Sequence, residues 1–390
     1  MTGLAFLERL EARPHLRATE IELLPVRATE RTVWLIVRIR TDAGISGIGE
    51  ASDAFGFLRT TKADAARMEA ELGAFFELIQ GKSPLEIESF LQRGRGRAAS
   101  GLMPATAYSA IEQALWDITG QALDLPVYAL FGGKVRDVLP VYANINRATQ
   151  PRTPSGFAQT ATAAVKNGFE AVKAAPFDGF PKTGSPAPEI AAAVEQGIAA
   201  TLVMRDAIGP NIALMIDCHS FFDVPLAIEV ARRLEPANLT WYEEPVPPEK
   251  LDETVEIRRS IKQPMAAGEI LFGASGFAGL CNRRAVDVIM PDVKHCGGLL
   301  ELSRIASLAD VNGLAVAPHN PSGPVSTAAS AQTCAGMKNF RTLELQWGET
   351  PWRAELVDPP EQFDRGVFRL SDRPGIGVRL NEKVAAKYRL

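Results

Sequence analysis

The feature that most constrains this chain is an alternation that begins near residue 138 and continues to about residue 346. A short apolar strand is followed by a polar turn and a helical stretch, and the unit then repeats. The eight strand candidates are PVYANI, AVKAAP, ALMIDCH, TWYEEP, PMAAGE, VDVIMPD, LAVAPHN and TLELQ. Because these strands are too apolar to have a solvated face, and no GxGxxG turn indicates a doubly wound sheet, the pattern predicts a closed (β/α)8 barrel.

The segments on either side of this alternation have other periods. Residues 19–50 are rich in β-branched residues around a Thr-Asp-Ala-Gly turn, which predicts an antiparallel sheet. Residues 63–129 place apolar side chains three and four positions apart, which predicts amphipathic helices. Residues 365–388 return to strands and turns. We therefore expect an α+β capping domain, the barrel, and a C-terminal segment that packs back on the cap, at residues 1–130, 131–358 and 359–390.

The charge, cysteine content and apolar runs of the chain exclude several classes of partner. The 390 residues carry a net charge of −4 without blocks of like charge, so the basic stripe that nucleic acid requires is missing. The four cysteines form no CxxC pair, which favours a reduced, cytoplasmic protein. We see no signal peptide and no run of about 18 apolar residues, so no membrane span is expected. A symmetric homo-oligomer is expected because such assemblies are common among soluble proteins.

Acidic residues stand at the ends of three consecutive strand candidates, as Asp217, Glu243 and Glu269. In a barrel these ends converge on one point, where three carboxylates stay ionised only around a cation. Oxygen ligands in this number suit Mg²⁺, with Mn²⁺ as a substitute. For any single acid, a helix-capping or surface role is the alternative. Glu244 alternates to the other face, and we expect it to form a salt bridge behind the barrel.

Asp292 and His319 end the next two strands. Neighbouring strand ends lie close enough for the carboxylate to hydrogen-bond the imidazole and raise its basicity, so the pair is a candidate general base. His219, two residues past Asp217, should lie on the same side as that ligand and face the substrate, although a structural role is the alternative. His295 lies in the turn after Asp292, where we expect a capping or solvent-facing role.

Two further ionisable residues lie at barrel strand ends. Lys173 ends the second strand, where its ammonium group can lie near a bound carboxylate, but Ala175 two positions on has no titratable group. The histidine side must then handle the substrate's α-proton, which argues against racemisation. Glu344 on the eighth strand can hydrogen-bond a developing enolate oxygen or pair with a charge across the barrel rim.

Substrate contacts are expected from cap loops over the barrel mouth, around residues 24–32 and 51–61. The candidates in these loops are Arg27, Arg31, Phe55 and Arg59. Arg147, just after the first barrel strand, could bind hydroxyls or a second carboxylate. Each of these side chains could equally be a solvated surface group.

In order along the chain, these motifs resemble the mandelate-racemase-like subgroup of the enolase superfamily, over nearly the whole length. The motifs are IEQALWDITGQALDLPVYALFGG, Asp-Cys-His at 217–219, WYEEP, AAGE, MPD, APHN, LELQ and PGIGV. The resemblance implies that Mg²⁺ is bound by Asp217, Glu243 and Glu269.

The same resemblance assigns roles around the metal. It implies a base dyad of Asp292 and His319, and a hydrogen bond from Glu344 to the enediolate. Racemases of the subgroup usually carry Lys-x-Lys, whereas residues 173–175 read Lys-Ala-Ala and keep only the first lysine.

The Asp-x-His motif at 217–219 and the run APHNPSGPVSTAAS look like galactonate dehydratase and related sugar-acid dehydratases, in which the histidine matching His219 helps the β-hydroxyl depart. The resemblance thus implies a Mg²⁺-dependent loss of water from a sugar acid, giving a 2-keto-3-deoxy acid. The enzymatic alternative is a cycloisomerase, epimerase or racemase acting on a carboxylate or lactone. The alternative outside catalysis is a metal-dependent sugar-acid binding protein.

Overall fold

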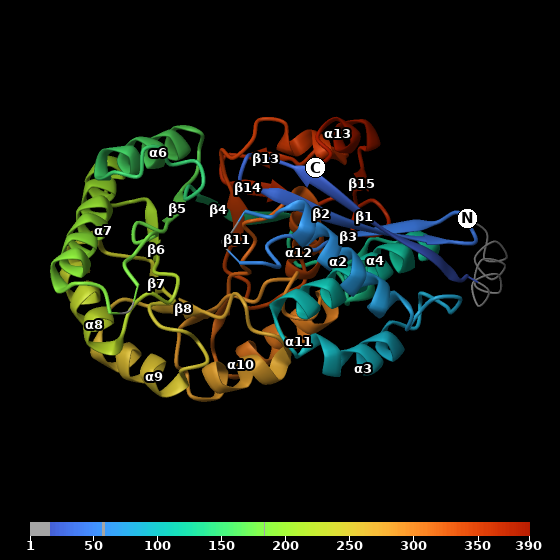
Figure 1. Ribbon diagram of the computed structural model, residues 1–390, viewed down its shortest axis with the longest axis horizontal. Coiled ribbons are helices and arrows are strands. Elements are labelled where there is room, and N and C mark those ends of the chain that lie inside the picture. Colours follow the sequence, from blue (N-terminus) through green and yellow to red (C-terminus); the bar gives the residue numbers. More distant parts are fainter. Residues whose placement is uncertain (1–15, 57–58, 183) are drawn as a thin grey trace.

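The computed structural model describes residues 16–56, 59–182 and 184–390, and places a cap beside a ring of strands and helices (Figure 1). The cap begins with an antiparallel sheet of β1 (Ala18–Arg27), β2 (Val33–Thr41) and β3 (Ser46–Glu50). Its helices are α2 (Lys62–Phe76), α3 (Ile87–Ala98), α4 (Leu102–Leu123) and the short α5 (Val127–Leu130).

Helix α4 packs on β3 so closely that the strand requires glycine. A Cβ atom at Gly47 or Gly49 would stand 2.1 Å from the carbonyl oxygen of Ala114 or Ala110, respectively. The missing side chains therefore let the helix backbone approach the sheet directly.

The ring is a barrel of eight parallel strands. They are β4 (Val138–Asn144), β5 (Ala171–Ala174), β6 (Ala213–Asp217), β7 (Trp241–Glu243), β8 (Met265–Ala267), β9 (Val288–Ile289), β10 (Ala315–Val316) and β11 (Leu343–Gln346). Successive strands pair from β4 to β10, and β11 pairs with β4. Between β10 and β11, Val316 N–H donates to Asn339 O (2.9 Å) and Arg341 N–H donates to Val316 O (2.8 Å). The predicted (β/α)8 barrel with an α+β cap is confirmed.

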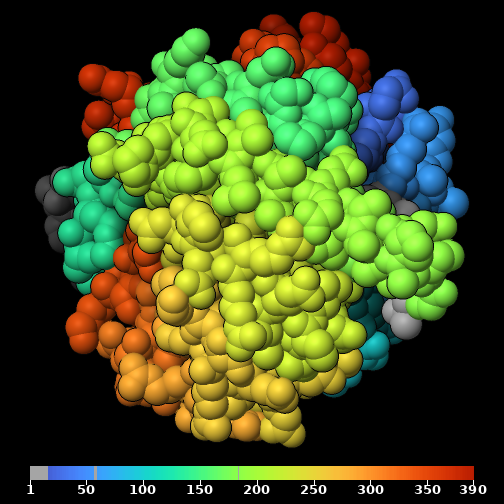
Figure 2. Space-filling view, turned by 90° about the vertical axis from the view of Figure 1, so that its left-hand side faces the viewer, coloured from blue at the N-terminus to red at the C-terminus, as the bar shows by residue number. Residues whose placement is uncertain are grey.

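Helices between the strands form the outer layer of the barrel. They are α6 (Pro154–Lys166), α7 (Ala187–Ile208), α8 (Val224–Arg233), α9 (Leu251–Ser260), α10 (Gly273–Asn282), α11 (Leu299–Val311) and α12 (Pro324–Cys334), with a 3-10 turn η2 (Glu235–Ala237) after α8. Figure 2 shows the outer face of this layer, with the chain running from α6 at the top to α10 at the bottom. Among the helices in the described ranges, none is both long and apolar enough to cross a lipid bilayer.

A cluster of buried side chains fills the barrel interior below the strand ends. The cluster consists of Tyr142, Met215, Trp241, Ala266, Val288, Met290 and Ala317. The rings of Tyr142 and Trp241 meet edge to face with centroids 5.6 Å apart, and Lys173 Nζ lies 5.6 Å from the centroid of the Tyr142 ring. Above this filled interior, the carboxyl ends of the strands open to a cavity, where barrels carry their sites.

The C-terminal segment contacts both the barrel and the cap. Its elements are η3 (Arg353–Leu356), β12 (Val357–Asp358), β13 (Phe363–Asp364), β14 (Val367–Arg369), β15 (Arg379–Leu380) and α13 (Glu382–Lys387). Strand β14 pairs antiparallel with the start of β4. At the chain end, Arg27 N–H donates to Tyr388 O (2.7 Å) and Leu390 N–H donates to Pro25 O (3.1 Å), so the segment returns to β1 of the cap.

Two buried carboxylates of the cap accept hydrogen bonds from barrel helices. Glu50, at the end of β3, accepts the N–H groups of Gly323 (2.7 Å) and Ser326 (2.9 Å) at the start of α12. Glu112 of α4 accepts the first two N–H groups of α11, at 2.7 and 2.9 Å. Because the first N–H groups of a helix have no partner within that helix, these carboxylates satisfy them and fix the cap over the barrel at defined points.

Candidate active site

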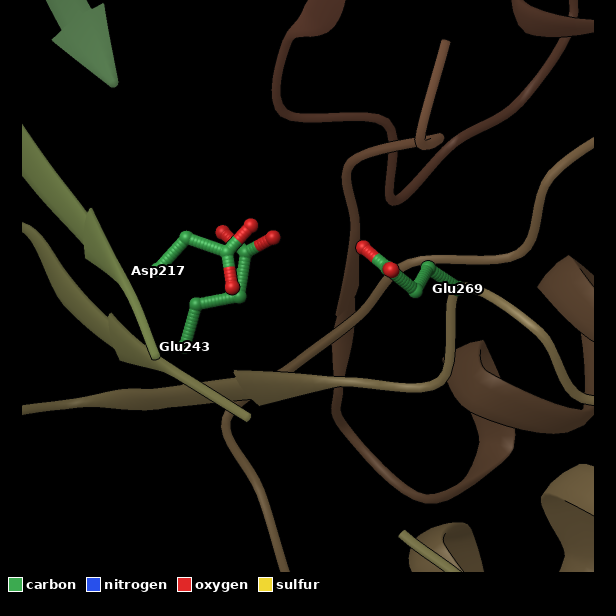
Figure 3. A group of neighbouring side chains, drawn as sticks. All are labelled: Asp217, Glu243 and Glu269. Atoms are coloured by element: carbon green, nitrogen blue, oxygen red, sulfur yellow. The ribbon is translucent and has the colours of Figure 1, made fainter. Parts of the chain in front are cut away.

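Three buried carboxylates meet at neighbouring strand ends of the barrel. Asp217 ends β6, Glu243 ends β7, and Glu269 lies two residues past β8. Each offers an oxygen, and these oxygens all lie within 4.8 Å of one another. In Figure 3, Asp217 and Glu243 lie together and Glu269 points toward them across a gap.

The surroundings of this triad fit a hard divalent cation. Glu269 Oε2 is buried and accepts no hydrogen bond from the described residues, although His319 Nε2 lies 3.1 Å away. Burial and the carboxylate of Asp217 raise the pKa of Glu243 well above its ordinary value, as expected for acids held together. An all-oxygen donor set with an unsatisfied buried oxygen is the kind of site that Mg²⁺ or Mn²⁺ favours.

Lys173 lies at the floor of the triad. Its Nζ is 2.7 Å from Glu243 Oε1, 2.9 Å from Glu344 Oε1 and 3.6 Å from Asp217 Oδ2, and its side chain is buried. Burial opposes its charge, but Glu243 and Glu344 outweigh burial and raise the pKa of Lys173 well above its ordinary value. The ammonium group therefore stays charged between the ligand carboxylates and Glu344.

His319 and Asp292 form the pair expected from the sequence geometry. His319 Nδ1 lies 2.8 Å from Asp292 Oδ2, which leaves Nε2 directed toward Glu269. Burial lowers the pKa of His319, but Glu269, Glu344 and Asp292 outweigh this and raise it to about 9. The imidazole is thus held by a carboxylate on one nitrogen and exposes the other at the triad.

His219 approaches the triad from the Asp217 side. Its Nε2 lies 3.0 Å from Asp217 Oδ2, and its Nδ1 lies 2.5 Å from Asp178 Oδ1 in the loop after β5. Burial opposes the charged imidazole, but Asp217 and Asp178 outweigh burial and raise the pKa of His219 well above its ordinary value. Each ring nitrogen therefore faces a carboxylate, an arrangement that suits a protonated imidazole.

Glu344 lies deeper than a substrate-facing acid would. Its Oε1 accepts hydrogen bonds from Lys173 (2.9 Å) and Asn144 Nδ2 (2.8 Å), and its Oε2 accepts the Asn320 N–H (2.8 Å). His319 Nε2 is 3.9 Å away. Of the two roles considered, the contacts in this structure correspond to charge pairing across the barrel.

Two expectations from the sequence are wrong. Glu244 forms no salt bridge within the described part of the chain; it accepts hydrogen bonds from Ser220 Oγ (3.1 Å) and the Gly268 N–H (3.0 Å). Its backbone φ of 39° ends the strand alternation on which that expectation rested. His295 does not face solvent but is 2% exposed, with Nδ1 2.9 Å from Thr106 Oγ1 of the cap.

 

A cavity of about 190 Å³ lies at the strand ends, lined by residues of both the cap and the barrel. On the barrel side its lining includes Asn144, Asp217, His219, Glu269, His295 and His319. The cavity continues outward into a second one of about 760 Å³, and Arg31, Asn146 and Arg147 line both. Asp217, Glu269, His219 and His319 therefore open into one space at the barrel mouth.

The expected substrate contacts divide into two groups. Arg31 and Arg147 line the cavities, whereas Arg27, Phe55 and Arg59 are not among the described residues that line them. Arg59 is exposed and pairs with Glu30 at 3.5 Å, and the Phe55 ring lies under the Arg67 guanidinium with 5.3 Å to its centroid. Phe55 packs against the core of the cap, and Arg27 is the last residue of β1.

Arg147 is held by acids from two other segments. Its Nη2 lies 3.0 Å from Asp53 Oδ1 and its Nη1 lies 3.5 Å from Glu349 Oε1. Burial opposes its charge, but Asp53 and Glu349 outweigh burial and raise the pKa of Arg147 above its ordinary value. Its positive charge is therefore largely compensated before any substrate arrives.

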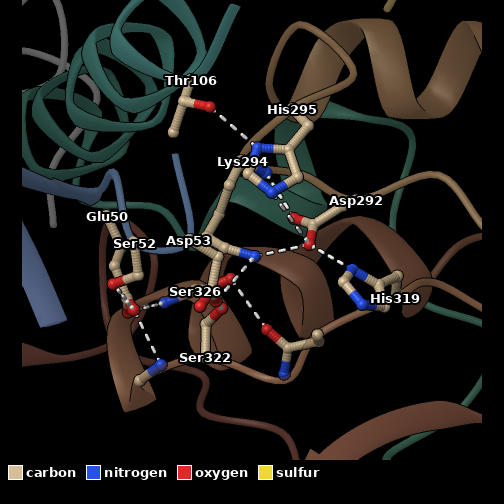
Figure 4. Close-up of polar contacts among 12 residues, drawn as sticks. Glu50, Ser52, Asp53, Thr106, Asp292, Lys294, His295, His319, Ser322 and Ser326 are labelled. Carbon is tan, nitrogen blue, oxygen red and sulfur yellow. Dashed lines mark hydrogen bonds and ion pairs between the residues drawn. The ribbon is translucent and has the colours of Figure 1, made fainter. Parts of the chain in front are cut away.

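The sequence reasoning missed three polar residues around the histidines: Asp53, Asp178 and Lys294. Asp178 holds His219, while Lys294 Nζ lies 2.5 Å from Asp292 Oδ2 and 4.0 Å from Asp53 Oδ2 (Figure 4). The sequence could have indicated Lys294, because it lies two positions past Asp292 and a period of two places it on the same side. Asp53 and Asp178 lie in irregular loops, where no periodicity places a side chain.

A capped (β/α)8 barrel with carboxylates at three successive strand ends, and a histidine on each side of them, defines an enzyme of the enolase type. The chain belongs to the mandelate racemase/muconate lactonizing enzyme family. The model of that family's N-terminal domain matches residues 15–132, and the enolase C-terminal domain-like model matches residues 156–384. Enzymes of this superfamily use a divalent metal, and the buried acidic triad is present here.

Known relatives share most of the chain. A D-xylonate dehydratase of Haloferax volcanii is 33% identical over 89% of this chain and 83% of its own length. A D-galactonate dehydratase of Variovorax paradoxus is 31% identical over 90% of this chain and 89% of its own length. The solved structure of a mandelate racemase/muconate lactonizing enzyme-like protein from Rubrobacter xylanophilus is 33% identical, with a TM-score of 0.85 over 96% of this chain and 98% of that one.

Proposed function

We propose that this chain is a Mg²⁺-dependent dehydratase of sugar acids that converts an aldonate to a 2-keto-3-deoxy acid. The observation that carries the proposal is the placement of two histidines at one carboxylate triad, His219 against Asp217 and His319 against Glu269. Elimination of water requires a base at the α-carbon and an acid at the β-hydroxyl, and the two imidazoles supply both. The two relatives named D-xylonate dehydratase and D-galactonate dehydratase support the same reaction.

The ligands of the metal in this proposal are Asp217, Glu243 and Glu269. A divalent cation held there would bind the substrate carboxylate and offset the negative charge that develops when the α-proton leaves. Lys173 keeps its own charge beside Glu243 and Glu344, and so adds a fixed positive charge below the reacting carboxylate.

His319 is the base of the proposed reaction. Its Nδ1 is held by Asp292, so the neutral imidazole carries its lone pair on Nε2, which takes the α-proton; a cation at the triad would offset the charge of Glu269, the main group that raises the pKa of His319. The C–H bond breaks and its electron pair is first delocalised onto the substrate carboxylate; the pair then forms the double bond between the α- and β-carbons as the β C–O bond breaks. Glu269 Oε2 accepts no hydrogen bond within the described residues, which is consistent with an Nε2 that acts as an acceptor.

His219 is the acid of the proposed reaction. Asp178 and Asp217 face its two ring nitrogens, which stabilises the protonated form that can transfer a proton to the departing hydroxyl. The hydroxyl then leaves as water, and the resulting enol tautomerises to the 2-keto-3-deoxy acid. A racemase would instead need a second base, and Lys173 is held between Glu243 and Glu344 with Ala175 two positions on.

The charge at the outer side of the cavity favours an aldonate over an aldarate. Arg147 is the candidate for a second substrate carboxylate, but Asp53 and Glu349 already pair with it. A second carboxylate would have to displace one of these acids, whereas a neutral hydroxyl can add to the pair. We therefore expect substrates with one carboxylate and a chain of hydroxyls.

The proposal is tested with a panel of aldonates and aldarates incubated with the purified protein and Mg²⁺. Semicarbazide detects the 2-keto acid, and the matched controls are a chelator and His319→Asn. We expect 2-keto acid from at least one aldonate, and none with either control. A 2-keto acid yield that is the same with the chelator, or no 2-keto acid from any of these acids, contradicts the proposal. Epimerised acid without 2-keto acid would identify the isomerase alternative.

A further inference from the structure

Lys294 is a buried cation that the proposed reaction does not use. Its side chain is 0% exposed, and its Nζ lies 2.5 Å from Asp292 Oδ2. Its own backbone N–H donates to the other oxygen, Asp292 Oδ1, at 2.7 Å. Figure 4 shows the ammonium group beside Asp292, on the side away from His319. Burying an ammonium group is unfavourable unless acids compensate it, so the residue requires an account.

Lys294 and His319 contact the same oxygen of Asp292. His319 Nδ1 lies 2.8 Å from Oδ2, the atom that also faces Lys294 Nζ. With Oδ1 held by the backbone and Oδ2 by two side chains, the carboxylate has one orientation. The imidazole that depends on this carboxylate is oriented in turn.

The second acid near Lys294 belongs to the cap. Asp53 Oδ2 lies 4.0 Å from Lys294 Nζ and accepts the Ser322 hydroxyl at 2.6 Å, while Asp53 Oδ1 pairs with Arg147 at 3.0 Å. Asp53 thus joins the loops that follow β4, β9 and β10. Its φ of 61° is unfavourable for a residue with a side chain and persists only where contacts hold it.

We propose that Lys294 is a positioning residue for the base, and that Asp53 is the cap residue that anchors it. The cap then sets the orientation of the Asp292–His319 pair and of Arg147 together, through one acid. This inference rests on the proposed function, because the base is defined by that reaction. A lysine that only neutralised Asp292 would support folding but would not affect the geometry of proton transfer.

The first test compares Lys294→Met, Lys294→Arg and the exposed control Lys262→Met. We expect Lys294→Met to lower kcat about 10- to 100-fold, because a misplacement of about 1 Å can reduce the rate by that factor. The KM and the affinity for Mg²⁺ alone, measured by calorimetry, should stay within a few-fold of the wild type. Lys294→Arg should recover part of kcat, and Lys262→Met should match the wild type. An unchanged kcat in folded Lys294→Met would overturn the proposal.

The second test asks whether Asp53 acts through Lys294. Asp53→Asn should lower kcat as well as raise KM, since it loosens both Lys294 and Arg147. In the double variant with Lys294→Met, the loss of kcat should be smaller than the product of the single losses, because both disrupt one connection. If the loss of kcat in the double variant equals the product of the two single losses, the proposal that Asp53 anchors Lys294 is overturned. If Lys294→Met does not fold, Asp53→Asn decides the question alone: a wild-type kcat overturns the proposal.

A spectroscopic measurement separates this inference from the proposed function. The chain has four histidines, so the ring ¹⁵N signals can be assigned with His319→Asn as reference. Without substrate, Lys294→Met and Asp53→Asn should shift the His319 Nδ1 signal and leave that of His219 in place. Absence of this shift contradicts the positioning role even if wild-type turnover is found. Inactivity of the wild type toward every acid, with the shift present, contradicts the proposed function instead.

Discussion

His319 and His219 differ in the carboxylates that hold them, and one substitution at each should separate two proton transfers. His319→Asn removes the base but keeps the three metal-binding carboxylates. The variant should still bind Mg²⁺ and substrate. The rate at which the substrate's α-proton exchanges in deuterated water should fall about 10²-fold or more. The proton NMR signal at C2 of the aldonate follows this loss. Proton removal at the wild-type rate would exclude His319 as the base.

His219→Asn should give the complementary result. The base remains, so the α-proton should still exchange with deuterium, but the β-hydroxyl no longer receives a proton when it leaves. Formation of the 2-keto acid should therefore fall about 10²-fold or more while C2 exchange continues. Product formation at an unchanged rate would assign the acid role to another group.

His295 should make stability depend on pH. Burial lowers its pKa to about 4 from an ordinary 6.5, so between these values the unfolded chain binds a proton that the folded chain does not. Stability is then complete above pH 6.5 and falls as the pH falls toward 4. Between pH 7.5 and 5 the loss from this group is about 2 kcal/mol. Urea unfolding of His295→Gln should show a correspondingly smaller pH dependence; an identical dependence would contradict the assignment.

At the residue scale, the sequence predicted the positions that a strand fixes and missed those that a loop fixes. Asp217 and Glu243 are the last residues of β6 and β7, and because these strands are adjacent in the barrel, the two carboxylates were predicted to lie side by side. His219 was placed by the period of two, yet its φ of 44° lies outside any strand. It still reaches Asp217 because the turn bends back over the strand end, which no periodicity predicts.

At the scale of elements, Glu112 of α4 should stabilise the start of α11. It accepts the N–H groups of Leu299 and Leu300 and the Trp116 Nε1–H at 2.8 Å. Glu112→Ala leaves these buried donors unsatisfied, so we expect a loss of about 2–4 kcal/mol in the free energy of unfolding. The matched control is Glu256→Ala on the exposed face of α9, which should stay within about 0.5 kcal/mol. Equal losses in the two variants would contradict the capping role.

The barrel elements were predictable because the strands are largely buried and most helices have one buried and one exposed face, and all eight strand candidates are found; α12, which is buried on all sides, is the exception. The strands themselves are shorter than their sequence motifs, down to Val288–Ile289 and Ala315–Val316. Asp292 and His319 accordingly lie three residues beyond the ends of β9 and β10, in the loops that follow these strands. The contacts between cap and barrel could not be predicted, since residues such as Asp53 and Lys294 meet only after both parts have folded.

At the scale of the whole molecule, the cap closes one side of the barrel mouth and the strand ends form the other. Arg31 and Asp53 come from the cap, and Arg147 and the histidines come from the barrel, so the cavity requires both. The domain bounds, the homo-oligomer, the cytoplasmic location and the roles of the individual site residues stay predictions.

The central claim is that one divalent cation lies between Asp217, Glu243 and Glu269. A crystal soaked in Mn²⁺ tests it most directly, because the anomalous signal of manganese locates the ion independently of its ligands. We predict a single strong peak within about 2.0–2.5 Å of an oxygen from each of the three residues. No peak among them, or a peak coordinated elsewhere, would contradict the account.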